Sequence, residues 1–136
     1  MRLLIDGNIV LDVLQKREPH FEDSSKIWKL CETGIADGFL SALTFANLVY
    51  VMRKELSPEK IEEVLIKLSI IFRFTEFGVS DLSGAAGMHW KDFEDALQAV
   101  TAERIHADYI VTRNVKDFLS RRIPAYTPTE LLLRLS

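Results

Sequence analysis

Cysteine and long apolar runs are both scarce in this sequence of 136 residues. The one cysteine, Cys31, cannot form an internal disulfide, which fits a reducing cytoplasm, and its helical surroundings favour burial over reactivity. No stretch approaches the roughly 18 uninterrupted apolar residues of a membrane-spanning helix, and the N-terminus lacks a signal-peptide pattern. We therefore expect a cytoplasmic protein that does not enter the membrane.

An excess of positive charge is also missing. Lysine and arginine number 17 against 20 aspartates and glutamates, which gives a net charge of −3 and an isoelectric point of about 5.6. Surfaces that bind nucleic-acid phosphates without specificity are normally basic, so that class of protein is disfavoured. The histidines show no metal-ligand spacing: His20, His89 and His106. We expect the acidic residues to be concentrated instead in a site that holds cations.

Short apolar runs alternate with amphipathic patterns along the chain. Hydrophobic residues make up 48% of a chain of one-domain length without repeats or linkers, so we expect one domain over residues 1–136. Strands are predicted at 2–5, 39–41, 72–77, 109–111 and 121–126. Helices are predicted at 8–16, 21–32, 43–55, 58–69, 80–88, 92–103 and 131–135. This alternation predicts an α/β fold, a three-layer α/β/α sandwich with a mainly parallel central sheet.

Polar residues follow two of the predicted strands directly. Asp6 comes after the first strand, and Thr112, Asn114 and Asp117 come after the fourth. Ligands of open parallel sheets bind at the carboxyl ends of the strands. If the two strands are neighbours, these side chains meet there, with Asp6 and Thr112 just past the strand ends. Asp95, in the first turn of the preceding helix, can join them.

The stretches around these residues resemble the motifs of PIN domains, the fold of many small metal-dependent ribonucleases, including VapC-type toxins. The matching stretches are IDGN at 5–8, EDALQA at 94–99 and IVTRNVKDF at 110–118. The three motifs stand in the family's order, and the resemblance covers nearly the whole chain. It implies a ribonuclease that depends on Mg²⁺ or Mn²⁺ and acts on RNA.

The resemblance also implies a role for each matching residue. Asp6, Asp95 and Asp117 would be the catalytic carboxylates and would hold Mg²⁺ or Mn²⁺, ions that take oxygen ligands. Such an ion neutralises charge on an attacked phosphate and makes water a better nucleophile. Clustered carboxylates repel one another without a cation, and we expect these three to share one small cavity. Five residues would support the site: Asn8, Asn47, Glu94, Thr112 and Asn114.

Asn47 departs from the family's pattern. The family usually carries an acid in the helix after the second strand, where this sequence has Asn47. An asparagine can ligate a metal through its carbonyl oxygen but brings no negative charge. We therefore expect weaker metal binding, and one ion more readily than two.

Simpler roles are open for several of these residues. Asp6 and Asn8 are also suited to cap the helix that follows them, and Glu94 to lie in solvent. Arg113 and Lys116 are candidates for contacts to RNA phosphates, although basic side chains on a surface are usually only solvated.

The leading hypothesis is a metal-dependent endoribonuclease, the toxin of a pair whose antitoxin protein keeps it inactive. The alternative is a non-catalytic RNA-binding or regulatory module on the same fold, which Asn47 motivates. A phosphohydrolase with Asp6 as nucleophile ranks last, because haloacid dehalogenases carry a second aspartate where this chain has Asn8.

A homodimer is expected through the 43–55 helix. Its apolar arc is wider than one core-facing stripe needs, with burial under the 58–69 helix as the alternative. The arc consists of Phe45, Leu48, Val49, Tyr50 and Met52.

Overall fold

Five parallel strands form one sheet in the computed structural model, which describes residues 1–118 and 122–136. The strands stand in the order β3–β2–β1–β4–β5, so β1 is central. Every neighbouring pair is parallel, which confirms the predicted α/β fold with its parallel sheet. The bounds are β1 Arg2–Ile5, β2 Asp37–Ser41, β3 Arg73–Thr75, β4 Tyr109–Val111 and β5 Ala125–Tyr126.

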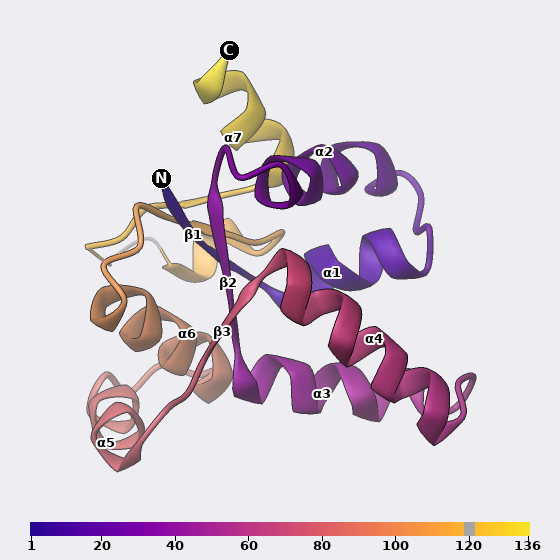
Figure 1. The fold of residues 1–136 in the computed structure, drawn as a ribbon. Coiled ribbons are helices and arrows are strands. Elements are labelled where there is room, and N and C mark those ends of the chain that lie inside the picture. The colour runs from indigo at the N-terminus through magenta and orange to yellow at the C-terminus, as the bar shows by residue number, and fades with distance from the viewer. Residues whose placement is uncertain (119–121) are drawn as a thin grey trace.

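Helices cover both faces of this sheet, as Figure 1 shows. Helices α5 and α6 pack on each other on one side, while α1, α2 and α7 pack together on the other, beside α3 and α4. In the described residues they are α1 Gly7–Leu14, α2 Phe21–Glu32, α3 Ala42–Met52, α4 Pro58–Ile71, α5 Val79–Gly87, α6 Phe93–Arg104 and α7 Pro128–Leu135, with a 3₁₀ helix η1 at Val115–Phe118.

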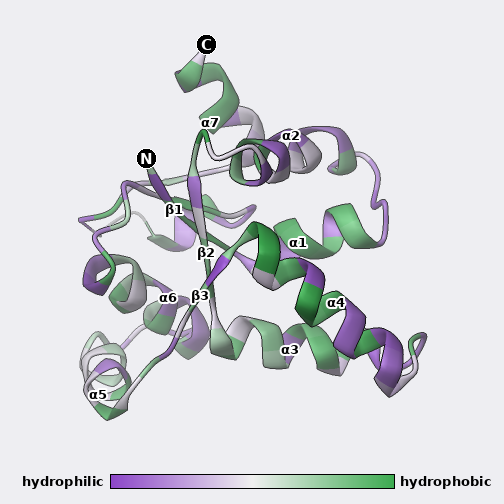
Figure 2. Cartoon of the chain, viewed as in Figure 1, coloured by the Kyte–Doolittle hydropathy of each residue, from purple (hydrophilic) through white to green (hydrophobic). Residues whose placement is uncertain are grey.

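Strand β1 is buried on both faces because helices lie over each. Its side chains alternate: Leu3 and Ile5 join the core with α1, α2 and α4, whereas Leu4 joins the core with α6. All three are fully buried. Burying a leucine or isoleucine contributes roughly 1.5–3 kcal/mol, so this short run is a strong anchor for the sheet. Figure 2 shows the same pattern, with α1 hydrophobic over most of its length and α4 mixed.

Capping residues set the starts of several helices. The Ser57 hydroxyl accepts the Lys60 N–H at 3.3 Å, and Pro58 takes the first helical position. The Asp92 carboxylate accepts the Asp95 N–H at 3.0 Å and so caps the N-terminus of α6. This cap orients the first turn of α6, which carries two acidic side chains.

Some predicted boundaries are wrong by a few residues. The 43–55 helix ends at Met52, because the chain turns there and the amides of Glu55 and Leu56 both donate to the Met52 carbonyl. Of the predicted 72–77 strand, only Arg73–Thr75 forms β3. Phe72 is instead the C-cap of α4, because its N–H donates to the Leu68 carbonyl. β3 and β5 are the two edge strands of the sheet.

Other ends differ as well, among them those of α5, α7 and β5. Helix α5 starts at Val79 because Asp81 accepts the Gly78 N–H at 3.0 Å from inside the first turn. Helix α7 starts at Pro128, earlier than predicted, since Thr127 and Glu130 cap each other reciprocally. Of the predicted 121–126 strand, only Ala125–Tyr126 forms β5; Arg121 lies outside the described residues.

Cys31 is buried in the core, as predicted, and packs near Gly38. Burial, with a smaller effect from the charge of Asp37, raises the pKa of the Cys31 thiol to about 12. The thiol therefore stays protonated and unreactive at neutral pH. Across residues 1–118 and 122–136, no helix combines the length and the apolar composition that crossing a bilayer requires.

Of the glycines, Gly38 leaves the least room for a side chain, and substituting it should show this. A Cβ at Gly38 would lie 2.6 Å from the Cys31 sulfur and 2.7 Å from the Phe72 ring. Gly38→Ala should lower the free energy of unfolding by about 1–3 kcal/mol through overpacking. Gly84→Ala is the control, because a Cβ there would meet only Val100, at 3.7 Å. That helical position should gain about 0.5–1 kcal/mol. Urea unfolding followed by tryptophan fluorescence measures both, and equal stabilities would contradict the packing argument.

Candidate functional site

Asp6 and Thr112 lie just past the carboxyl ends of the neighbouring strands β1 and β4, which confirms that prediction. Ile5 pairs with Val111, and the Asp6 N–H continues the ladder by donating to the Val111 carbonyl at 2.9 Å. The Thr112 hydroxyl donates to an Asp6 carboxylate oxygen at 2.9 Å. The Asn114 N–H in turn donates to the Thr112 hydroxyl at 3.1 Å. One chain of hydrogen bonds thus links both strand ends.

Opposing effects act on the Asp6 carboxylate. Burial raises its pKa above the ordinary value, because the charged form loses water. The Thr112 hydroxyl, the N–H groups of Gly7 and Asn8, and the charge of Arg113 act in the other direction. The two N–H groups belong to the start of α1 and form no full capping hydrogen bond with Asp6. Asn8 lies inside the first turn, so Asp6, and not Asn8, occupies the N-cap position.

Burial and several negatively charged side chains around Asp95 affect its pKa. Burial is the largest cause that raises its pKa, to about 7, and the charges of Asp92, Asp6, Asp117 and Glu94 raise it further. Carboxylates from β1, α6 and η1 therefore act on one another across the sheet edge. In the part of the chain that the structure describes, however, no three acidic, histidine or cysteine side chains are placed to hold a metal ion together.

A cavity of about 120 Å³ lies beside Asp6, and its acidic lining differs from the predicted one. Glu94 lines it, whereas Asp95 and Asp117 do not. Consecutive residues point about 100° apart around a helix, so only one of the two neighbouring acids of α6 reaches this space. Asn47 of α3 and Asn8 of α1 also line it, as two of the predicted supporting residues. The full lining is Asp6, Gly7, Asn8, Leu11, Thr44, Asn47, Leu48, Val51 and Glu94.

A buried amide next to this cavity was not among the predicted site residues. Gln98 is 6% exposed, and its Nε2 donates to the Thr44 hydroxyl at 3.3 Å. Its Oε1 is buried without a hydrogen-bond partner. Gln98 follows Glu94 by one helical turn, and that i, i+4 spacing could have identified it from the sequence. Ser41, by contrast, caps α3 by accepting the Leu43 N–H at 3.2 Å.

Sequence reasoning also missed Asp12. This aspartate stands in the otherwise apolar helix α1 and is fully buried. The Ser24 hydroxyl donates to it at 3.0 Å, and an Arg113 guanidinium nitrogen lies 3.4 Å from its other oxygen. A lone acid inside an apolar helical stripe was the signal that could have found it. Of the two predicted RNA contacts, Arg113 is thus engaged with Asp12, while Lys116 is exposed on η1.

Residues 2–116 match the PIN domain family, and the chain belongs to that family. It is similar to VapBC2 from Rickettsia felis bound to a DNA fragment from their promoter, with 19% identity over 93% of this chain and 98% of that chain and a TM-score of 0.71. It is also similar to a toxin–antitoxin complex from Klebsiella pneumoniae, with 20% identity, coverage of 93% and 97%, and a TM-score of 0.70.

A third similar structure is Mycobacterium tuberculosis VapC20, a sarcin–ricin loop cleaving toxin. The identity is 10%, the coverage is 79% of this chain and 86% of that chain, and the TM-score is 0.64. At these identities the three likenesses establish a shared fold. No curated protein matches the sequence at a significant level.

The raised pKa of Asp95 predicts how stability depends on pH without metal. Between the ordinary pKa of 3.8 and about 7, the folded protein holds a proton at Asp95 that the unfolded chain has released. Stability should therefore fall as pH rises through this range and be lowest above it. Asp95→Asn should flatten the profile and raise the melting temperature at pH 8 but not at pH 4. Melting curves in a chelating buffer measure this, with the exposed Glu62→Gln as control. A profile that Asp95→Asn leaves unchanged would disprove the assignment.

Proposed function

We propose that the protein is a metal-dependent endoribonuclease and the toxin of a toxin–antitoxin pair. The observation that carries this proposal lies next to the Asp6–Thr112 contact: burial, and then the charges of four acidic side chains, raise the pKa of Asp95. A cluster of this kind destabilises an empty fold, so its presence favours a function that uses a cation. Membership of the PIN domain family supports the same reading. So does the fold shared with a toxin that cleaves the sarcin–ricin loop.

The donor set suits Mg²⁺ or Mn²⁺. Every candidate ligand offers oxygen, and hard divalent ions prefer carboxylates, amide carbonyls and water. Asp6, Asp95 and Asp117 would hold the ion, with Glu94 and Asn47 as supporting residues on the wall of the cavity beside Asp6. When bound, the ion would supply positive charge for the phosphate and make water more acidic.

The chain's own residues would prepare the site for that chemistry. The Thr112 hydroxyl orients Asp6, and the Asp92 cap fixes the first turn of α6 that carries Asp95. The cavity beside Asp6 is small, at about 120 Å³. A nucleotide is too large for it, so the RNA backbone would cross its mouth. The exposed Lys116 on η1 would contact a flanking phosphate.

A second candidate function is a non-catalytic RNA-binding or regulatory module on the same fold. Asn47 favours it, because this uncharged side chain lines the cavity beside Asp6. An additional carboxylate there would strengthen a cation site. The Asn47 variant described below separates the two functions.

An antitoxin protein and a second copy of the chain are the proposed protein partners, in the cytoplasm where RNA is available. A cavity of about 440 Å³ between α1, α3 and α4, bordered by Leu14, Met52, Leu56 and Val64, would accept an apolar antitoxin segment. Tyr50 on α3 is 62% exposed and would contribute to the homodimer. Co-purification with the product of the neighbouring reading frame tests the first partner. Sedimentation that finds only monomer at high micromolar concentration would contradict the second.

Asp6→Asn should abolish RNA cleavage. It removes one carboxylate charge from the site and keeps the side-chain size, so the expected loss is at least about 100-fold in rate. The assay is cleavage of a mixed RNA pool with Mn²⁺ and with chelator. Asp37→Asn is the matched control, because Asp37 is exposed at the opposite end of the sheet. Equal cleavage by wild type and Asp6→Asn would show that the activity is a contaminant.

Asn47→Glu should tighten Mn²⁺ binding by about 10-fold, because it adds a carboxylate to the cavity. Titration calorimetry measures the dissociation constant. Ala46→Glu is the control, since it adds the same charge at the neighbouring, exposed position of α3. If both variants bind Mn²⁺ like wild type, Asn47 does not face the ion. If only Asn47→Glu cleaves RNA, the natural chain is a binding module and the ribonuclease proposal is wrong.

A further inference from the structure

Asp12 is an acid with no exposed surface. Two groups reach it from different elements: the Ser24 hydroxyl of α2 donates to one carboxylate oxygen at 3.0 Å, and Arg113 lies 3.4 Å from the other. Asp12 therefore has no surface with which to touch RNA. Any effect it has on the reaction must pass through a neighbouring residue.

Arg113 is the neighbour through which such an effect would pass. It stands between Thr112, whose hydroxyl holds Asp6, and Asn114, whose N–H returns to that hydroxyl. The Asn114 carbonyl then accepts the Asp117 N–H at 3.1 Å at the start of η1. Fixing the Arg113 side chain thus fixes the backbone that carries three predicted site residues.

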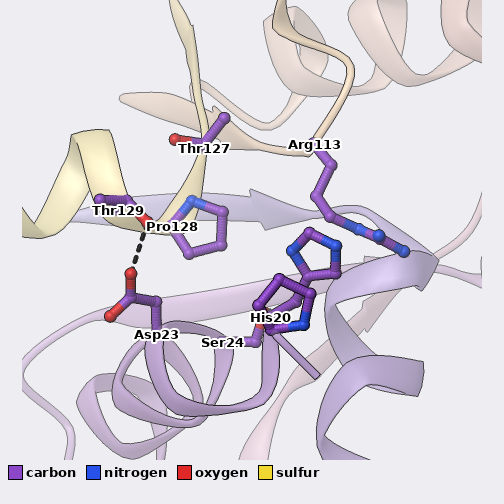
Figure 3. Close-up of a pocket in the computed structure, with 8 residues that line it drawn as sticks. His20, Asp23, Ser24, Arg113, Thr127, Pro128 and Thr129 are labelled. Atoms are coloured by element: carbon purple, nitrogen blue, oxygen red, sulfur yellow. Dashed lines mark hydrogen bonds between the residues drawn. The ribbon is translucent and has the colours of Figure 1, made fainter. Parts of the chain in front are cut away.

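The surroundings keep the Arg113 side chain partly enclosed. It is 28% exposed and borders a cavity of about 250 Å³ that His20, Thr127 and Pro128 also line. Figure 3 shows it extending from the strand edge to the ring of His20, with Pro128 and Thr129 on the opposite wall. Thr129 there donates to Asp23, which ties α7 to α2. Arg113 therefore reaches inward to α1 from the loop after β4.

Stability alone is a weak reason for this ion pair. A buried pair often stabilises a fold no better than apolar side chains of the same size, because both charges lose water. Here one Asp12 oxygen and the Arg113 Nε are buried without a hydrogen-bond partner. An arrangement selected for stability alone would satisfy both atoms or replace them. What the pair does provide is a fixed connection between α1 and the loop that follows β4.

We propose that Asp12 is a positioning residue for the active site, which it serves by holding Arg113 and, with it, the Thr112–Asn114 segment against Asp6. This inference rests on the proposed ribonuclease function and adds a residue to it. The proposal also gives Arg113 a different role from the predicted one: it holds the Thr112–Asn114 segment in place and does not contact RNA.

The test replaces the charged group by apolar side chains of similar shape. The triple variant Asp12→Leu, Ser24→Ala, Arg113→Met removes both charges and the hydroxyl that would lose its acceptor. Its urea midpoint should be no lower than that of wild type. Its kcat for RNA should nevertheless fall about 10- to 100-fold with KM within twofold, since loose positioning slows the step after binding. Asp12→Asn, which keeps Arg113 and a Ser24 acceptor, should lower kcat in the same direction.

The matched control is the other ion pair that has a buried carboxylate among the described residues, Asp81 with Arg104 at 3.1 Å. Arg104 stands at the end of α6 away from Glu94 and Asp95. Asp81→Leu with Arg104→Met should lower stability, because Asp81 also accepts the Gly78 N–H at the start of α5, and should leave kcat unchanged below the melting temperature. A control that loses kcat as the triple variant does would show a general packing effect and overturn the proposal.

Amide hydrogen exchange gives a second readout that needs no activity. In the triple variant the Asn114 amide should exchange at least about tenfold faster, while the Asp6 amide, bonded to Val111, keeps its rate. Unchanged exchange and unchanged kcat would overturn the proposal, and so would a raised KM at constant kcat, which would make Arg113 an RNA contact. If wild type cleaves no RNA, the ribonuclease function fails and the exchange rates alone decide the positioning role.

Discussion

The pairing of β1 with β4 is the constraint on which the rest of the site depends. Because Ile5 stands opposite Val111, Asp6 and Thr112 leave their strands side by side. A slip of one residue would turn every side chain of β4 to the other face and remove the hydroxyl from Asp6. Helix α6 runs into β4 and therefore antiparallel to it, which places its N-terminal turn at the same carboxyl edge. The acids of three distant segments thus meet through strand register.

The fold accommodates this concentration of negative charge in several ways. Asp6 and Asp95 each stand at the N-terminal end of a helix, where the helix dipole favours negative charge. The Thr112 hydroxyl and the Arg113 charge favour the ionised form of Asp6. Asp95 lacks comparable support, and burial with four neighbouring carboxylates makes its charge the least stable of the set. A cation would remove this residual repulsion, which connects the electrostatics to the proposed chemistry.

Sequence alone predicted the parallel sheet and the positions of Asp6 and Thr112 just past the ends of neighbouring strands, because each follows from a local pattern. A buried apolar run followed by a polar residue identifies both strand ends without knowledge of the rest of the fold. The features that it missed depend on helix rotation and on long-range packing. The rotation of α6 about its axis decides whether Glu94 or Asp95 faces the cavity. The packing of α6 against α3 decides the Gln98–Thr44 contact. A local pattern marks Asp12 by itself, but its pairing with Arg113 joins distant parts of the chain and follows only from long-range packing.

The edge strands of the sheet are short, and this limits how the molecule can associate. β3 offers three residues and β5 only two, immediately after Pro124. An added strand needs a row of free backbone donors and acceptors, and neither edge supplies a row of useful length. A partner must therefore recognise side chains on helices and not continue the backbone ladder. Binding specificity then resides in the surface residues of those helices, which can change during evolution without disturbing the sheet that holds the site.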